Sequence, residues 1–332
     1  MNTLFKLNLR LFAANTNVTT DTGLSNEMKT FYSDYLIDLA EPLLVHDQFG
    51  QKQPIPKNGG KTIEFRKYSP LAKALTPLTE GVTPNGQKLT MSVITATVDQ
   101  YGGYVTLSDV LLLTAIDNNM LQATELLASQ AGRTLDTITR EVLQGGTNVM
   151  YVNGKAARAS LAYTDATTND NMTFDTIRKA VRALKVQNTP RINGSYVAIV
   201  HPDVAYDIMS DPKWVNVKTY SDPSGMYEGE IGKIEGVRFV ETTEAKVYKD
   251  AGASSRDVYG TLILGANAYG VTEVTGGGLE HIVKQLGSAG SEDPLNQRAT
   301  VGWKAIKVAE RLVELYMIRV ESTSSFDDAP AN

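Results

Sequence analysis

Apolar and polar residues alternate along two stretches that flank a turn-rich segment within residues 61–104. In the first stretch, Ile63 and Phe65 alternate with polar residues, and this period of two is typical of a half-buried strand. In the second stretch the apolar phase shifts by one residue at Val93–Ile94, which predicts a bulge or a strong twist. The sequence therefore predicts an extended hairpin with two strand-like arms.

The segment between the two arms reads SPLAKALTPLTEGVTPNGQK and has too few large apolar residues to form a core. A two-stranded hairpin is marginally stable alone in water, so its apolar face needs another surface. That surface belongs either to a neighbouring subunit or to the hairpin's own domain, and the pattern alone fits both. Gly102 and Gly103 are expected to form a flexible joint at the end of the second arm.

Helical periodicity follows the hairpin. Thr106–Asp109 has the form of a capping box and predicts the start of a helix, which Asp117–Asn119 would interrupt. A longer helix is predicted over Met120–Gln144, ending at Gly145–Gly146, with a length of roughly 35 Å. Its expected buried stripe consists of Ala128, Ala131, Leu135, Ile138 and Val142.

Helices and strands alternate from Met172 to about Thr275, which predicts a compact α/β unit. Its expected elements are a helix at 174–187, strands at 195–200, 236–240 and 261–264, and a helix that starts at His201–Asp203. Beyond the glycines at 276–278, three further strands are expected at 279–286, 298–308 and 312–320. The polar tail at 322–332 is expected to be loose.

The N-terminal segment MNTLFKLNLRLFAANTN superficially resembles a signal peptide, but Lys6 and Arg10 interrupt its apolar stretch. The alternation of leucines with polar residues predicts instead an extended arm that docks on another surface. A helix is expected at Leu24–Leu44, with Pro42 marking its end.

Composition narrows the classes of protein. The 332 residues contain no cysteine, which excludes disulfides, thiolate nucleophiles and zinc–thiolate sites. The net charge of −5 argues against a free nucleic-acid-binding protein, although it allows a protein that encloses nucleic acid. No apolar run reaches the roughly 18–20 residues that span a bilayer, so no membrane association is expected.

Candidate chemistry is sparse. The three histidines are not at metal-ligand spacing, and Gly60–Thr62 lacks the upstream glycine and the following helix of a phosphate-binding loop. His201 with Asp203 and Asp207 could form a general base supported by carboxylates. A strand-to-helix turn with an acidic first helical turn explains the same residues, and we favour it. We expect no catalytic residue, no cofactor, no metal and no enzymatic activity.

Several motifs, in their order along the chain, carry a family resemblance. They are Val105-Thr-Leu-Ser-Asp109, Arg133-Thr-Leu-Asp136, His201-Pro-Asp203, Val240-Glu-Thr-Thr-Glu-Ala245 and Asp293-Pro-Leu-Asn-Gln-Arg-Ala-Thr-Val-Gly-Trp-Lys304. With them the chain resembles the major capsid protein of tailed bacteriophages, and specifically the N-four-type major capsid family with the Hong Kong 97-like fold. Leu7-Asn-Leu-Arg-Leu-Phe-Ala13 also looks like the start of capsid proteins from phages of Gram-positive hosts. The resemblance extends over Leu24–Glu321.

The resemblance implies an α+β fold with an N-terminal arm, an extended β-hairpin loop, a peripheral domain with a long spine helix, and an axial α/β domain. The expected boundaries are 1–50 for the arm, 51–105 for the loop, 106–171 and 276–321 for the peripheral domain, 172–275 for the axial domain, and 322–332 for a flexible tail. The loop would lie on the adjacent subunit. Expected inter-subunit contacts are Phe65, Leu71, Leu75, Leu78, Arg298 and Trp303, of which Trp303 fits burial in its own domain better.

The implied function is that of a shell protein. The chain would assemble with itself through hexameric and pentameric capsomers into an icosahedral virion shell, built in the bacterial cytoplasm, around double-stranded DNA that it does not read by sequence. A separate scaffolding protein, a portal and decoration proteins are the expected partners. No motif identifies a partner for a Lys–Asn crosslink, so none is expected. The alternatives are an encapsulin-like bacterial compartment and a cytoplasmic hydrolase using His201 and Asp203.

Overall fold

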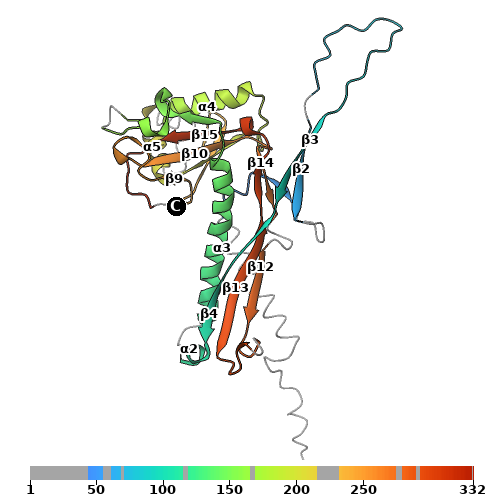
Figure 1. Ribbon diagram of the computed structural model, residues 1–332. Helices are drawn as coiled ribbons and strands as arrows, with labels where there is room; N and C mark the ends of the chain where they lie inside the picture. The colour runs from blue at the N-terminus through green and yellow to red at the C-terminus, as the bar shows by residue number, and fades with distance from the viewer. Residues whose placement is uncertain are drawn as a thin grey trace, which may run out of the picture.

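The structure, a computed structural model, describes residues 44–54, 61–68, 71–114, 119–164, 169–214, 232–273, 279–288, 292–330 and 332. The predicted arm at 1–50, with the expected helix at 24–44, lies almost entirely outside the described residues. Figure 1 shows three parts: an α/β unit, an elongated unit built on a long helix, and a hairpin loop that projects from their junction.

The α/β unit is a mixed sheet with the strand order β5-β15-β10-β6-β8-β7, and β9 pairs with β10. Its central strands, β6 (Tyr196–Val200) and β10 (Val258–Leu264), are buried along their whole length, as the continuous apolar runs predict. The other strands are β5 (Val149–Tyr151), β7 (Lys233–Ile234), β8 (Val237–Glu241), β9 (Val247–Tyr248) and β15 (Met317–Ser322).

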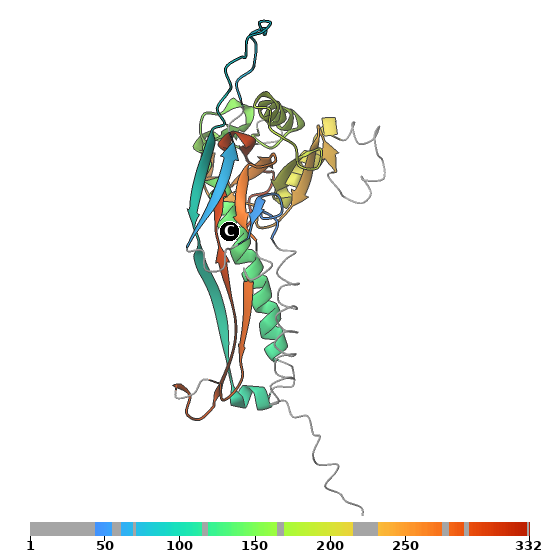
Figure 2. The same cartoon turned by 90° about the vertical axis from the view of Figure 1, so that its right-hand side faces the viewer.

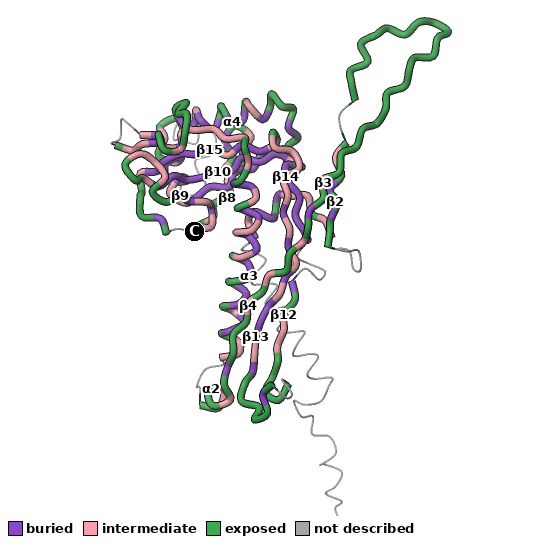
Figure 3. Tube along the Cα trace, in the orientation of Figure 1, coloured by how far each residue is buried: buried purple, intermediate pink, exposed green. Residues whose placement is uncertain are grey.

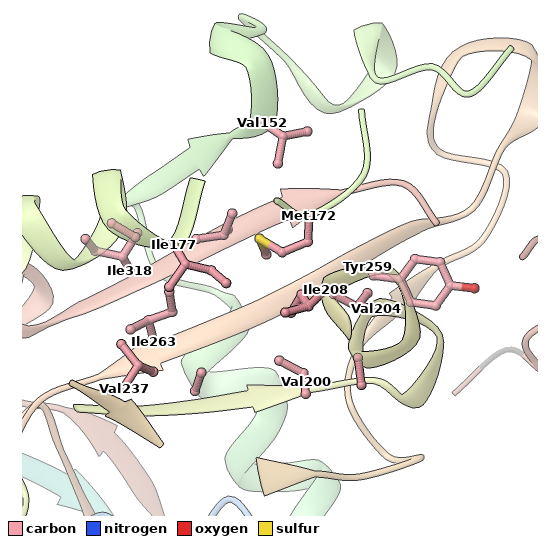
Figure 4. Packing of buried hydrophobic residues seen from close by; sticks show 14 of the residues in the cluster. Val152, Met172, Ile177, Val200, Val204, Ile208, Val237, Tyr259, Ile263 and Ile318 are labelled. Carbon is pink, nitrogen blue, oxygen red and sulfur yellow. The ribbon is translucent and has the colours of Figure 1, made fainter. Parts of the chain in front are cut away.

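Two helices cover one face of this sheet. Helix α4 (Phe174–Val186) buries the predicted stripe of Ile177, Val181 and Leu184, and α5 (Pro202–Ser210) starts at the predicted residue. Figure 4 shows Val204 and Ile208 of α5 pointing into the same cluster as Ile263 and Ile318 of the sheet. The other face packs on the C-terminal end of the long helix.

The elongated unit consists of helix α3 (Asn119–Gln144) packed against a three-stranded antiparallel sheet in the order β12-β13-β4. The strands are β4 (Asp99–Ser108), β12 (Leu279–Lys284) and β13 (Arg298–Lys307). Small residues of α3, Ala128 and Ala131, allow the sheet to approach closely, and they pack with Val301, Trp303 and Ala305 of β13. At 1.5 Å per residue α3 is roughly 39 Å long, close to the predicted length.

The hairpin forms as predicted, with β2 (Thr62–Tyr68) paired to β3 (Met91–Thr97). Of the bulge or strong twist predicted at Val93–Ile94, the bulge is wrong, because the register runs without interruption through Phe65↔Ile94 and Arg66↔Val93. The chain instead changes partner after Thr97, where β3 ends and β4 begins its pairing with β13. Gly102 and Gly103 lie inside β4, so the flexible joint predicted there is also wrong.

The base of the hairpin packs on its own chain. A small sheet of β1 (Gln51–Gln53), β11 (Tyr269–Thr272) and β14 (Ala309–Arg311) lies at the junction of the two units. Phe65 is only 1% exposed, and a β-carbon on Gly270 would overlap its ring. Glycine at 270 therefore makes room for Phe65, and burial of this ring fixes the hairpin base to β11.

Two expectations about the C-terminal part of the chain are corrected. The strand expected at 312–320 starts at residue 317, after a 3₁₀ turn at Glu314–Tyr316. It pairs with β10 and β5 in the α/β unit, whereas the expected boundaries assigned it to the peripheral domain. The tail is not loose: Ser322–Ser324 are buried, and the Asn332 amide bonds to the Ala245 carbonyl at 2.6 Å.

The start of the short helix α2 (Asp109–Thr114) also differs from the prediction. Thr106 belongs to β4, and the hydroxyl of Ser108 accepts the Leu111 N–H at 3.2 Å. Further short 3₁₀ turns occur at Val152–Gly154, Arg158–Ser160 and Ala253–Ser255.

A buried polar clamp holds the segment at 44–50 against α3 and β13. Asp136 of α3 accepts two bonds of 2.7 Å, from the backbone N–H of His46 and from its ring Nδ1. Asp47 accepts the Thr139 hydroxyl at 2.6 Å and pairs with the ammonium of Lys307, whose side chain has no exposed surface. Charges buried in this way need partners, so the clamp specifies where the chain enters the elongated unit.

Candidate assembly interface

The loop tip, residues 71–90, is exposed throughout and is not paired into a sheet (Figure 3). The side chains predicted to make contacts, Leu71, Leu75 and Leu78, are 57%, 82% and 77% exposed. Val82 and Leu89, which the prediction omitted, are 63% and 62% exposed. Large apolar side chains exposed together on one segment are typical of an interaction site.

A groove with a volume of about 590 Å³ lies on the β12-β13-β4 sheet. The pairing of β13 with β4 shows which face of the sheet the groove occupies. Val301, Trp303 and Ala305 point toward α3, so the alternate residues Thr300 and Gly302 point away from it. The groove is lined mainly by such alternate residues: Gly102, Tyr104 and Thr106 of β4, Ile282 and Lys284 of β12, and Thr300 and Gly302 of β13.

Glycine keeps the floor of the groove open. A β-carbon on Gly302 would lie 2.8 Å from the β-carbon of Tyr104, and one on Gly102 would lie 2.7 Å from the Trp303 carbonyl oxygen. Any larger residue at either position would displace the neighbouring strand. The glycines of β4 and β13 therefore allow the strands to pair closely beneath an open surface.

Arg298 and Trp303, both predicted contact residues, line the same groove. The backbone N–H of Arg298 donates to Asp293 at 2.8 Å, and its guanidinium donates to the Glu292 carbonyl at 2.7 Å, which leaves part of the side chain exposed. Trp303 is 4% exposed, and its indole N–H donates to Gln130 of α3 at 3.2 Å. Trp303 thus supports the groove from within its own subunit.

Phe65 is separate from the other predicted residues, because its ring is buried at the hairpin base and presents no surface to a partner. Tyr104 and Ile282 also line the groove but were not predicted from the sequence. Tyr104 is 76% exposed. The strand pairing places Tyr104 and Ile282 on the same face, opposite Gly302, and this pairing cannot be deduced from the alternation within each strand.

His201 and the aspartates of α5 have structural roles. The His201 ring accepts the Asp203 N–H at 3.3 Å as the helix cap. The Asp203 carboxylate accepts the Tyr259 hydroxyl at 2.7 Å, and Asp207 accepts the N–H and the hydroxyl of Ser325 at 3.1 and 2.6 Å. The carboxylates that a general base would need are thus engaged in holding the helix, the sheet and the tail together.

Burial lowers the pKa of His201, against the opposing effect of Asp203. His201 therefore binds a proton less readily in the folded chain than in the unfolded chain, where its pKa is 6.5. The folded state consequently loses stability relative to the unfolded state as the pH falls below 6.5. We expect His201→Asn, which keeps a good N-cap, to reduce this loss. Urea unfolding of both proteins at about pH 7.5 and 5.5 measures it, and equal losses would contradict the prediction.

The described residues contain no group of three or more histidine, aspartate or glutamate side chains that could hold a metal ion. Within the same part of the chain, no helix has the length and apolar character needed to cross a membrane.

The fold is the Hong Kong 97-like fold of phage shell proteins. The chain is similar to the solved capsid of Ralstonia phage GP4, with 16% identity over 86% of this chain and 87% of the other and a TM-score of 0.63. It is also similar to the cyanophage Pam1 capsid (16% identity, 87% and 93% covered, TM-score 0.62) and to that of cyanophage P-SCSP1u (14%, 83% and 87%, 0.60).

Residues 113–285, slightly more than half of the chain, match the family model described as phage capsid protein. No curated protein matches the sequence. The chain belongs to the phage capsid protein family.

Proposed function

We propose that this chain is the major capsid protein of a tailed phage. It assembles through hexamers and pentamers into an icosahedral shell that encloses double-stranded DNA, and it catalyses no reaction. Family membership supports the virion shell as its location and favours a phage shell over an encapsulin-like compartment. A separate scaffolding protein, a portal, decoration proteins and assembly in the host cytoplasm belong to the same proposal.

The observation that carries the proposal is the exposed apolar tip at 71–90. The tip projects from the junction of the two units, away from the sheet that bears the groove (Figures 1 and 2). Its leucines therefore have no burial site on the described part of their own chain. Contacts between unlike surfaces of identical subunits form rings when the rotation between neighbours closes, and a ring is the symmetry that a capsomer needs.

In this proposal the loop tip of one subunit lies in the groove of the next. Ile282 and Tyr104 supply apolar contacts to the leucines, and Arg298 contacts backbone carbonyls at the rim. The parts of the fold have the roles that the family resemblance implies, but their boundaries differ from those expected from the sequence. The hairpin is the extended loop, α3 with β4, β12 and β13 is the peripheral domain, and the α/β unit including β15 is the axial domain.

Replacing Ile282 by glutamate tests the groove. Ile282 is half-buried and lies opposite Gly302 in the sheet, so a docked loop would remove a carboxylate at this position from water. We expect Ile282→Glu to fold but to reduce assembly at least 10-fold, because burying the charge costs more than the roughly 1.4 kcal/mol that corresponds to a tenfold change in affinity. Ile282→Val, which keeps the apolar surface, is the matched control.

Electron microscopy and sedimentation of the purified proteins measure assembly. Uniform shells or capsomers from wild type and Ile282→Val, with subunits only from Ile282→Glu, are the expected results. A small oligomer from the wild type under all conditions would overturn the proposed function. Wild-type assembly by Ile282→Glu would overturn only the assignment of the groove.

A further inference from the structure

The exposed face of helix α4 is strongly basic, although the whole chain carries a net charge of −5. The helix buries Ile177, Val181 and Leu184 against the sheet, and its opposite side is exposed. Four cations lie on that side over two turns: Arg178, Lys179, Arg182 and Lys185. Figure 1 shows α4 on the outer side of the α/β unit, where no other labelled element covers it.

Little negative charge balances this row. Arg178 is the only one of the four that forms an ion pair with described residues, with Glu235 at 3.5 Å and with Asp175 at 4.0 Å. The pKa of Asp175 is lowered, first by the hydrogen bond from Lys213 and further by the charges of Arg178 and Lys179. Lys179, Arg182 and Lys185 form no ion pair with any carboxylate in the described part of the chain.

A groove of about 420 Å³ lies beside the row. It is lined by Arg178, Val181, Arg182, Lys185, Val186 and Glu235. Cations three and four residues apart on a helix are about 5–6 Å apart, so the row presents positive charge along roughly 10 Å of one edge of the groove.

We infer that the exposed face of α4 contacts the phosphate backbone of double-stranded DNA without reading its sequence. The inference rests on the proposed function, because the enclosed DNA is the polyanion that this face would meet. It places α4 at the inner surface of the shell. Lysine and arginine side chains bind DNA by neutralising phosphates and releasing their counterions, and this contact needs no apolar surface.

A contact with another copy of the chain fits the face less well. The centres of protein–protein interfaces are apolar and depleted in lysine. On the exposed side of α4, Val186 is the one large apolar residue, and it is 61% exposed at the end of the helix. The face therefore has the chemistry of a backbone-contacting surface rather than that of an interface core.

The test compares two triple variants of the full-length, unassembled chain. Lys179→Gln/Arg182→Gln/Lys185→Gln removes the three unpaired cations, and glutamine preserves helix propensity. Lys61→Gln/Lys73→Gln/Lys88→Gln removes three exposed cations of the hairpin loop and changes the net charge by the same amount. Arg178 is retained because of its ion pairs.

The readout is the salt dependence of binding to short DNA duplexes of two different sequences. Each lost phosphate contact lowers the slope of log K against log salt concentration by about 0.9. We expect the slope of the α4 variant to be smaller by about 2.7 on both duplexes. When the salt concentration rises from about 50 to 200 mM, the wild type is therefore expected to lose roughly 40 times more of its DNA affinity than the variant loses. The loop variant is expected to keep the wild-type slope.

Equal slopes for the two variants, or no binding of DNA by the wild type at low salt, would overturn the inference. An α4 variant that keeps the wild-type slope but loses capsomers would show a contact between copies instead, and would also overturn it. Shell formation by the wild type, observed by electron microscopy, is independent of all these results, so the proposed function can stand while the role of α4 falls.

Discussion

Deleting Leu71–Asn85 is expected to yield a folded subunit that no longer forms shells. Every residue of this segment is exposed, and the hydrogen bonds that involve it remain within the loop tip. The deletion therefore removes no part of the described core, while it removes the three leucines proposed to dock on the next subunit. Circular dichroism and urea unfolding measure folding, and electron microscopy with sedimentation measures assembly.

Two sets of point substitutions separate the apolar contacts from the length of the loop. Leu71→Ser/Leu75→Ser/Leu78→Ser is expected to abolish assembly, since each leucine would lose about 1.5–3 kcal/mol of burial at the interface. Its matched control, Thr76→Ala/Thr79→Ala/Thr83→Ala, alters three polar positions of the same tip and is expected to assemble. If the deletion unfolded the subunit, the tip would be part of its own core and the interface assignment would be wrong.

The α/β unit could be predicted from local patterns because its elements are defined by adjacent residues. Helix α4 shows a helical apolar stripe, β6 is a continuous apolar run, and the proline at the start of α5 suits the first turn of a helix. The length of α3 was predictable for the same reason, since its small-residue stripe ends at two glycines.

Strand partners could not be predicted, because pairing joins residues far apart in the sequence. The register is uninterrupted at the apolar phase shift near Val93–Ile94, and the chain changes partner from β2 to β13 only after Thr97. A local interpretation of the phase shift suggests a bulge and gives no sign of this change of partner. Likewise β15 shows the alternation of a strand without showing that its partner is β10.

The candidate interface was predictable in part. Exposed leucines in a turn-rich loop are visible in the sequence, whereas the groove needs Tyr104, Ile282 and Gly302 from three strands to lie on one face. The tail was expected to be loose because its residues are polar, yet Ser325 and Asn332 form hydrogen bonds with α5 and β9. Polar composition does not predict exposure when the folded chain supplies partners.

Substituting Lys307 by methionine is expected to destabilise the subunit by about 3–5 kcal/mol, because the carboxylate of Asp47 would remain buried without its cation. Methionine preserves most of the side-chain volume, so packing changes little. Lys304→Met is the matched control on the same strand: its ion pair with Glu280, at 2.8 Å, is 42% and 58% exposed, so its loss is expected to cost less than about 1 kcal/mol.

The double variant Lys307→Met/Asp47→Asn tests the cause of that loss. Asparagine removes the buried charge, while its side-chain oxygen can still accept the Thr139 hydroxyl that Asp47 accepts at 2.6 Å. We expect the double variant to recover more than half of the lost free energy of unfolding, measured by urea denaturation of unassembled subunits. If Lys307→Met cost no more than Lys304→Met, the clamp would not be what fixes the segment at 44–50 to the elongated unit. If the double variant lost as much free energy of unfolding as Lys307→Met and Asp47→Asn lose together, the charges of Lys307 and Asp47 would not act on each other.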